Sequence, residues 1–296
     1  MLALISASPA LRAAAPLEPE SPVVALRATV AGSGDVRLAG GGQKFSAMRT
    51  EEIGLRADYS PLKVGGAALG FSAFVQRTDF NQDRKPWTLP LPERFQSAGV
   101  EFSYEEQFGA GWQGLLQISP SWRTAGGSRL VARSFGVTVT TLAVHEFSPA
   151  LRFALGASAD SLAEGSNRLV PVAGLDWAFA PQWRLALGLP RTGVFFTPTP
   201  ALEFGLVAEG TWTTYYVARS GAAQRLADLR LTDTKIEYTE ARAGLQAKWR
   251  ASSHVDLGLT VGVVGLRQFE YPDRQRKLKS SGEAGGYASV ELGFAF

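Results

Sequence analysis

The chain has 296 residues, a formal net charge of +3 and no cysteine. The lack of cysteine excludes disulfides, thiolate metal sites and cysteine nucleophiles, and so small a charge predicts no nucleic-acid partner. No stretch approaches the ~18 consecutive apolar residues that a membrane-spanning helix requires. A mean hydropathy near zero still fits a transmembrane β-barrel, because its strands alternate apolar and polar residues.

The first 21 residues differ from the rest of the chain. The apolar run from Leu2 to Ile5 and the triplet Ala13 to Ala15 are typical of the end of a secretory signal peptide with its cleavage site. Arg12 interrupts the apolar run and the start is not basic, so a disordered tail is the alternative. We therefore assign residues 1–21 to a signal-peptide remnant or tail and residues 22–296 to one folded domain.

From about Val23 to the end, apolar and polar residues alternate with a period of two, which predicts β-strands and no helix. The clearest examples are 52–59, 202–209, 240–249, 254–263 and 287–296. Several run for ten residues, against ~5–6 in soluble sheets and ~9–11 in a tilted transmembrane strand. We predict a single antiparallel up-and-down transmembrane β-barrel, with a soluble β-sandwich as the alternative all-β fold.

The predicted connections are of two kinds that alternate along the chain. Tight turns are expected at 60–63, 108–111, 148–150, 180–182, 199–200 and 251–253, and long polar loops at 32–49, 78–95, 124–132, 160–167, 219–235 and 270–283. Outer-membrane barrels have short turns at one rim and long loops at the other. The count is about 14 strands if 183–200 forms a hairpin and 12 if that region is irregular. A count of 14 places both termini at the short-turn rim.

Aromatic side chains lie beside the tight turns. They are Tyr59, Phe108, Trp112, Phe147, Phe153, Trp177, Phe179, Trp183, Phe204, Trp249 and Phe296. Trp and Tyr settle at the bilayer interface because their rings are apolar with a polar edge. This placement predicts an aromatic girdle at one rim, although a general preference of aromatic residues for strand ends is the alternative explanation.

The final strand has apolar residues at every second position and ends on an aromatic residue. In this pattern Val290, Leu292, Phe294 and Phe296 share one face, and the segment resembles the C-terminal signature of Gram-negative outer-membrane proteins. The resemblance implies that these four residues form the assembly signal read by the barrel-assembly machinery, and that the chain resides among the lipids of the bacterial outer membrane.

A second resemblance covers about a third of the chain. The region 169–269, with Pro171, the Trp177 to Trp183 hairpin and Pro190, is similar to an uncharacterised family of outer-membrane barrel proteins. That family brings no assigned activity with it.

The polar faces of the strands carry charges of both signs. Facing lipid, each would cost ~2–4 kcal/mol at the bilayer midplane, so the alternation predicts that they line the lumen. These candidates are Arg56, Asp58, Glu101, Arg152, Glu203, Glu209, Glu240, Arg242, Lys248, Asp256 and Glu291.

Such charges either pair across a closed interior or line a water-filled pore. About 14 strands enclose more space than side chains alone fill, which favours a passive channel or a small-solute transport protein. A structural or interaction barrel with a closed lumen is the second hypothesis.

We predict no enzymatic activity, no cofactor and no metal site. The two histidines, His145 and His254, both lie beside tight turns. Ser252, His254 and Asp256 follow one another on one strand and cannot converge as a catalytic triad must. The basic residues Arg274, Arg276, Lys277 and Lys279 in 270–283, together with Arg84 and Lys85, either bind lipopolysaccharide phosphates or are simply solvated.

Overall fold

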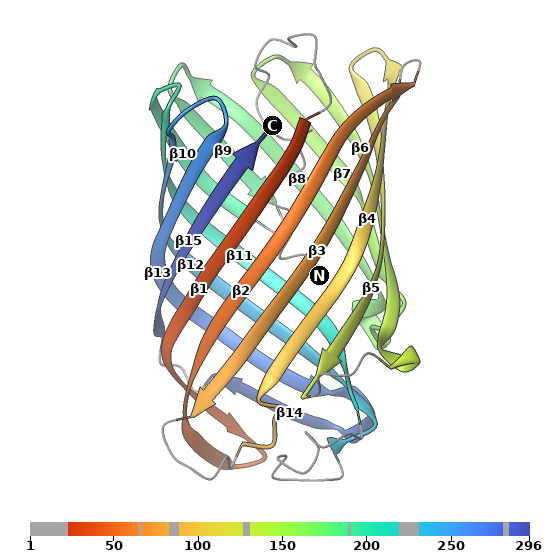
Figure 1. The fold of residues 1–296 in the computed structure, drawn as a ribbon, viewed down its shortest axis with the longest axis vertical. Helices are drawn as coiled ribbons and strands as arrows, with labels where there is room; N and C mark the ends of the chain where they lie inside the picture. Colours follow the sequence, from red (N-terminus) through yellow and green to blue (C-terminus); the bar gives the residue numbers. More distant parts are fainter. Residues whose placement is uncertain are drawn as a thin grey trace.

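The structure is a computed structural model that describes residues 23–64, 67–82, 89–126, 131–188, 191–218, 231–280 and 284–296. It is a closed antiparallel β-barrel (Figure 1). β14 and β15 occupy one place in the wall, because each pairs with both β13 and β1. The wall therefore has 14 positions, which confirms the higher of the two predicted strand counts. The expectation for residues 1–21 lies outside the described part of the chain.

The strands follow one another around the barrel in sequence order. They are β1 (Val23–Gly40), β2 (Gln43–Val64), β3 (Ala67–Gln82), β4 (Arg94–Gly109), β5 (Trp112–Ala125), β6 (Phe135–Ser148), β7 (Leu151–Asp160), β8 (Leu169–Ala180), β9 (Trp183–Gly188), β10 (Arg191–Thr199), β11 (Leu202–Val217), β12 (Thr234–Arg250), β13 (Val255–Tyr271), β14 (Arg276–Ser280) and β15 (Gly285–Ala295). Within the part of the chain that the structure describes, three short 3-10 helices, at 132–134, 165–168 and 272–274, lie between strands. Among the described residues, no helix is long and apolar enough to span a membrane.

The two ends of the barrel differ. At one end, here called the turn end, β4–β5, β6–β7, β8–β9 and β10–β11 are joined by two residues each, and both β1 and β15 have their chain termini there. At the other end, here called the loop end, β1–β2 and β9–β10 are also joined by two residues each, and the remaining connections are longer. The hairpin predicted within 183–200 exists as β9 and β10. Its connection and that of β1–β2 are short although they lie at the loop end, so the predicted alternation of short and long connections has two exceptions.

Three predicted connections are wrong: 60–63, 32–49 and 270–283, the last of which contains β14. β2 continues through 60–63, and the register shifts between Tyr59 and Leu62. Pro61 has no N–H for the ladder, so it is accommodated at this irregularity instead of ending the strand. The predicted loop 32–49 is mostly strand, because β1 and β2 join through Gly41 and Gly42, whose positive φ angles suit a two-residue hairpin.

The long strands form a narrower ring at the loop end, here called the neck. There the ends of β11 and β5 pair directly, Tyr216 with Thr124 and Val217 with Ala125, although five strands separate them along the wall. β14 completes the ring between β13 and β1. The neck thus contains nine strands (β1–β5 and β11–β14), while β6–β10 end before they reach it. A ring of roughly eight strands is just wide enough for side chains to fill.

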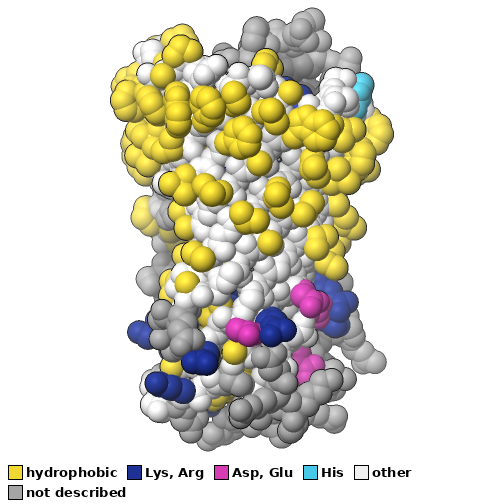
Figure 2. Space-filling view, turned by 90° about the vertical axis from the view of Figure 1, so that its left-hand side faces the viewer, with side chains coloured by type: hydrophobic (Ala, Val, Ile, Leu, Met, Phe, Trp, Pro, Cys, Tyr) yellow, Lys and Arg dark blue, Asp and Glu magenta, His cyan; other side chains and the backbone are white. Residues whose placement is uncertain are grey.

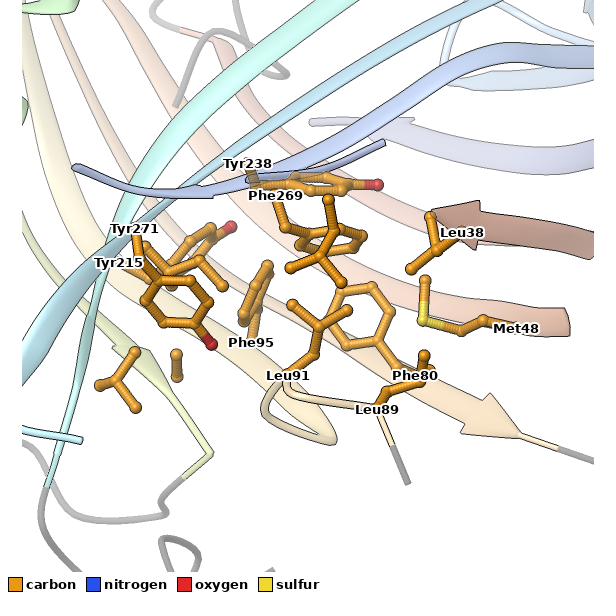
Figure 3. Packing of buried hydrophobic residues seen from close by; sticks show 14 of the residues in the cluster. Leu38, Met48, Phe80, Leu89, Leu91, Phe95, Tyr215, Tyr238, Phe269 and Tyr271 are labelled. Atoms are coloured by element: carbon orange, nitrogen blue, oxygen red, sulfur yellow. The ribbon is translucent and has the colours of Figure 1, made fainter. Parts of the chain in front are cut away.

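Side chains fill the neck. Its core comprises Val36, Leu38, Met48, Phe80, Leu89, Leu91, Phe95, Ala125, Tyr215, Val217, Leu231, Ile236, Tyr238, Val264, Phe269, Tyr271 and Leu278. Figure 3 shows 14 of these residues pointing from several strands toward one centre, with Leu89 and Leu91 entering from the connection between β3 and β4. Phe95 stacks on Tyr215 with 4.3 Å between ring centroids, and the hydroxyl of Tyr271 donates to the carbonyl of Pro90 at 3.0 Å.

The outer surface of the barrel is apolar. Outward-facing residues such as Val30, Leu55, Leu206 and Leu245 are more than half exposed. Figure 2 shows apolar side chains covering most of one face and the charges gathered toward the loop end. The predicted aromatic residues Phe108, Phe147, Trp249 and Phe296 and their neighbours lie exposed around the turn end, where a membrane girdle is expected.

We expect Phe95→Ala to lower the free energy of unfolding by ~3–5 kcal/mol, because it leaves a cavity in the neck core. Phe102 on the same strand is half exposed on the outer face and is the matched control. Phe102→Ala creates no internal cavity and should cost clearly less. Urea unfolding in detergent micelles measures both values, and equal losses would contradict a packed neck.

Candidate functional site

The charges predicted to line the lumen lie on the inner side of the wall. Arg242 of β12 reaches Glu52 of β2 at 3.2 Å, although β13, β15 and β1 lie between these strands in the wall. Such a contact can form only through the interior of the barrel. The lumen is therefore the candidate functional site, and its polar residues form layers along the axis.

The layer next to the neck is an alternating chain of buried charges. It runs from Glu52 through Arg242 and Glu240 to Arg267, with 2.6 Å between Arg242 and Glu240 and again between Glu240 and Arg267. Arg267 is fully buried and also donates to the hydroxyl of Ser33. The predicted residues Glu240 and Arg242 are brought together here, and Arg267 and Glu52 join them.

Arg267 was not among the predicted site residues. An extra residue in β13 shifts the register of its pairing with β12, between Ala241 and Arg242. This shift reverses which positions face inward beyond Val264. The strict two-residue alternation read from the sequence therefore fails beyond this point of β13.

Two further ion clusters lie nearer the turn end. On one side Arg56 binds Asp58 at 2.5 Å and Glu101 at 2.6 Å. On the opposite side Arg184 binds Asp176 at 3.0 Å and Glu203 at 3.5 Å.

Arg191, one strand further on, lies 3.4 Å from the predicted lumen residue Glu209. Both Arg184 and Arg191 lie over the ring of Phe195. Glu209 keeps 35% of its side chain exposed although it lies inside the barrel. Space for water is therefore present at this level.

The remaining predicted charges lie close to the turn end. Glu291 pairs with Arg27 at 3.3 Å and is 41% exposed, and Arg152 pairs with Glu146 at 3.2 Å. Asp256 lies 3.7 Å from Arg250, and both are 60% exposed. Lys248 is on the inner side of β12, two residues before Arg250. Exposure thus rises from the neck to the turn end, where the lumen is wet.

One sector of the lumen wall is apolar. Leu115, Leu142, Val144, Ala154 and Val172 form a buried cluster on the inner faces of β5–β8. The charged clusters come mainly from β1–β4 and β9–β13. The lumen is therefore lined by paired charges on one side and by an aliphatic strip on the other.

The histidines do not build a catalytic arrangement. His145 faces outward and stacks on Trp112 with 4.4 Å between ring centroids. His254 is exposed, its ring contacts the hydroxyl of Ser253, and its backbone N–H donates to Ser252. Within the described ranges, no group of three or more His, Asp or Glu residues could hold a metal ion. The absence of an enzymatic activity stays a prediction.

The terminal strand closes the barrel. Its pairing with β1 and β13 brings Arg27 opposite Gly293 and Val255 opposite Phe294, and the N–H of Phe296 donates to the carbonyl of Val24. Val290, Phe294 and Phe296 are exposed on the outer face, with Leu292 partly covered between them.

Within the predicted basic loop 270–283, Lys277 of β14 binds Glu270 at 2.8 Å. Arg84 and Lys85 lie outside the described residues.

These features define a closed transmembrane-type β-barrel with a polar lumen, which is the fold of outer-membrane proteins. The family model for the "Domain of unknown function (DUF6268)" matches residues 69–284, so the chain belongs to this family. This agrees with the resemblance to an uncharacterised outer-membrane barrel family. No curated protein matches the sequence.

Among solved structures, the chain is similar to the COG4313 outer membrane channel from Pseudomonas putida F1. The TM-score is 0.52 at 12% identity, over 96% of this chain and 100% of that one. It is also similar to the translocator domain of the autotransporter NalP from Neisseria meningitidis, with a TM-score of 0.45 at 9% identity, over 99% of this chain and 94% of that one. At these identities the likeness concerns the fold alone.

We expect Glu240→Gln to lower the free energy of unfolding by ~3–5 kcal/mol, because it leaves the buried Arg267 without its anion. The double variant Glu240→Gln with Arg267→Met should recover most of that loss. Glu291→Gln is the control at the wet rim and should cost less than ~1 kcal/mol. Urea unfolding in micelles checks all three, and similar losses for Glu240→Gln and Glu291→Gln would contradict the burial gradient.

Proposed function

We propose that this protein is an outer-membrane channel for small solutes, and that its lumen is the aqueous path. One observation carries the proposal: charges along the lumen remain partly exposed, from Glu209 at 35%, opposite Arg242, to Glu291 at 41% near the turn end. A purely structural barrel needs no water beside its interior charges. The fold shared with a channel of 12% identity is consistent with this role.

The proposed orientation follows the ordinary topology of such barrels, with short turns in the periplasm and long loops outside. The wet vestibule then opens to the periplasm and the neck points to the cell exterior. Val290, Leu292, Phe294 and Phe296 would serve as the assembly signal for the barrel-assembly machinery. Contact of the outer loops with lipopolysaccharide is a further proposal.

The charges are paired in most of the lumen, and this pairing supports a path without strong preference for cations or anions. Arg56 with Glu101 and Arg184 with Glu203 are examples. The paired guanidinium groups also hold the carboxylates against the wall, which keeps the centre of the vestibule free for a solute.

The second candidate function is that of a structural or interaction barrel of the cell envelope. The observation that favours it is the packed neck, since Phe95, Phe269 and Tyr271 are at most 1% exposed and leave no straight path along the axis. A barrel of this kind would use its outer loops as the working surface and would conduct nothing.

Planar-bilayer recording of the refolded chain in potassium chloride separates the two functions, and we expect discrete current steps. The double variant Glu203→Lys with Glu209→Lys should shift the reversal potential in a salt gradient toward anion preference. Glu106→Lys is the control, because Glu106 lies on the outer face beside Tyr104. Absence of any current from the folded protein would refute the channel and leave the structural barrel.

A further inference from the structure

The barrel wall has a break beside the neck. β8 pairs with β9 only from Gly174 to Ala180, and β10 pairs with β11 only as far as Glu209. Toward the loop end, residues 169–173 of β8 and 210–215 of β11 therefore face each other across a place where the described residues form no ladder. The short β9–β10 hairpin ends beneath this break.

The break lies where the wide and the narrow parts of the barrel meet. β11 leaves the line of the wall at its end and pairs with β5, so the ends of β6–β10 form a shoulder outside the neck. Figure 1 shows β14 and the β1–β2 hairpin extending the barrel at its lower, loop end. The aliphatic strip on the inner faces of β5–β8 leads along the lumen toward this shoulder.

Two segments lie at the shoulder: residues 160–168, here called the latch, and the neighbouring residues 131–134. Leu162 and Ala163 are buried at 5% and 6% exposure. Leu162 packs against β6 where Gly136 lacks a side chain: a Cβ there would lie 2.5 Å from Leu162 Cγ. The glycine at this position leaves room for Leu162 against the inner face of β6.

Polar contacts hold the latch across the break. Lys235 of β12 binds Glu164 at 2.8 Å, and Glu237 of β12 accepts hydrogen bonds from Asn167 and from the N–H of Glu164.

Two other contacts hold Asp160 at the base of the latch and Arg133 in the neighbouring segment 131–134. Arg123 of β5 binds Asp160 in a bidentate pair at 2.5 and 2.6 Å, and Arg133 binds Asp233 at 3.0 Å. Glu164 and Arg133 keep 41% and 72% of their side chains exposed, so water can replace their contacts when the latch moves, whereas Arg123 and Glu237 are buried.

The neck and the latch differ in what opening requires. Opening the neck exposes its aromatic core to water and breaks the direct pairing of β11 with β5. Opening the latch breaks hydrogen bonds and ion pairs, among them the partly exposed pair of Glu164 with Lys235, and exposes Leu162 and Ala163. Salt and water weaken such an exposed pair far more than they weaken the packing of the neck.

We propose that the lumen communicates with the outer side through the shoulder between β8 and β11, and that the latch 160–168 closes this lateral exit while the neck stays shut. The proposal rests on the channel function proposed above. The solute leaves beside the neck, over the exposed face of β8 with Leu169, and does not pass along the barrel axis.

The test uses cysteine pairs, because the chain has no cysteine of its own. Glu164→Cys with Lys235→Cys ties the latch to β12. Thr124→Cys with Tyr216→Cys ties the seam between β5 and β11 and is the matched control. Both are joined by a short thiol cross-linker in the folded protein, and current in potassium chloride is recorded in a planar bilayer before and after linkage.

We expect the latch link to abolish the current and the seam link to leave it unchanged. Glu164→Gln with Glu237→Gln should lengthen the open time several-fold without any link, whereas Asp35→Asn, which breaks an exposed ion pair with Arg49 on another hairpin, should not. Loss of current with the seam link alone, or current that survives the latch link, overturns the lateral exit. If the unmodified chain carries no current, the channel function itself fails.

Discussion

The backbone ladder that closes on itself is the constraint on which the rest of this structure depends. In a bilayer every N–H and C=O needs a partner within the protein, and β15 provides the last ones by pairing with both β13 and β1. Because a closed wall fixes the side of every residue, apolar residues must face lipid and charges must face the lumen. The ion clusters of the interior are a consequence of this closure.

Closure alone does not make the barrel uniform along its axis. β1–β6 and β11–β13 are 14 to 22 residues long, and β14 and β15 share one wall position beside them, whereas β7–β10 have between 6 and 12 residues. The long strands therefore meet beyond the loop-end limits of the short ones. The pairing of β11 with β5 narrows the barrel there from 14 wall positions to nine. A ring of nine can be filled by side chains and a ring of 14 cannot, so one end is packed and the other is wet.

The lumen follows the same division. Near the neck, Glu240 and Arg267 are almost completely buried and bind each other at 2.6 Å, an arrangement that holds parts of the wall together. Toward the turn end, the pairs become exposed and their contribution to stability falls with the access of water. Stabilising contacts are thus concentrated at the neck, and access of solvent to the lumen is greatest at the turn end.

The sequence by itself determined the class of fold, the turn end and the inward side of charges such as Arg56 and Glu203, and it favoured 14 wall positions over 12. It could do so because a two-residue period survives wherever the ladder is regular. Only the tertiary structure decided the neck, the inward position of Arg267 and the latch. Each depends on a register shift, such as the one beyond Ala241, or on pairing between strands far apart in sequence, such as β5 with β11. Local alternation carries no trace of either, because a shifted register reverses the faces and a distant pairing leaves no mark on its neighbours along the chain.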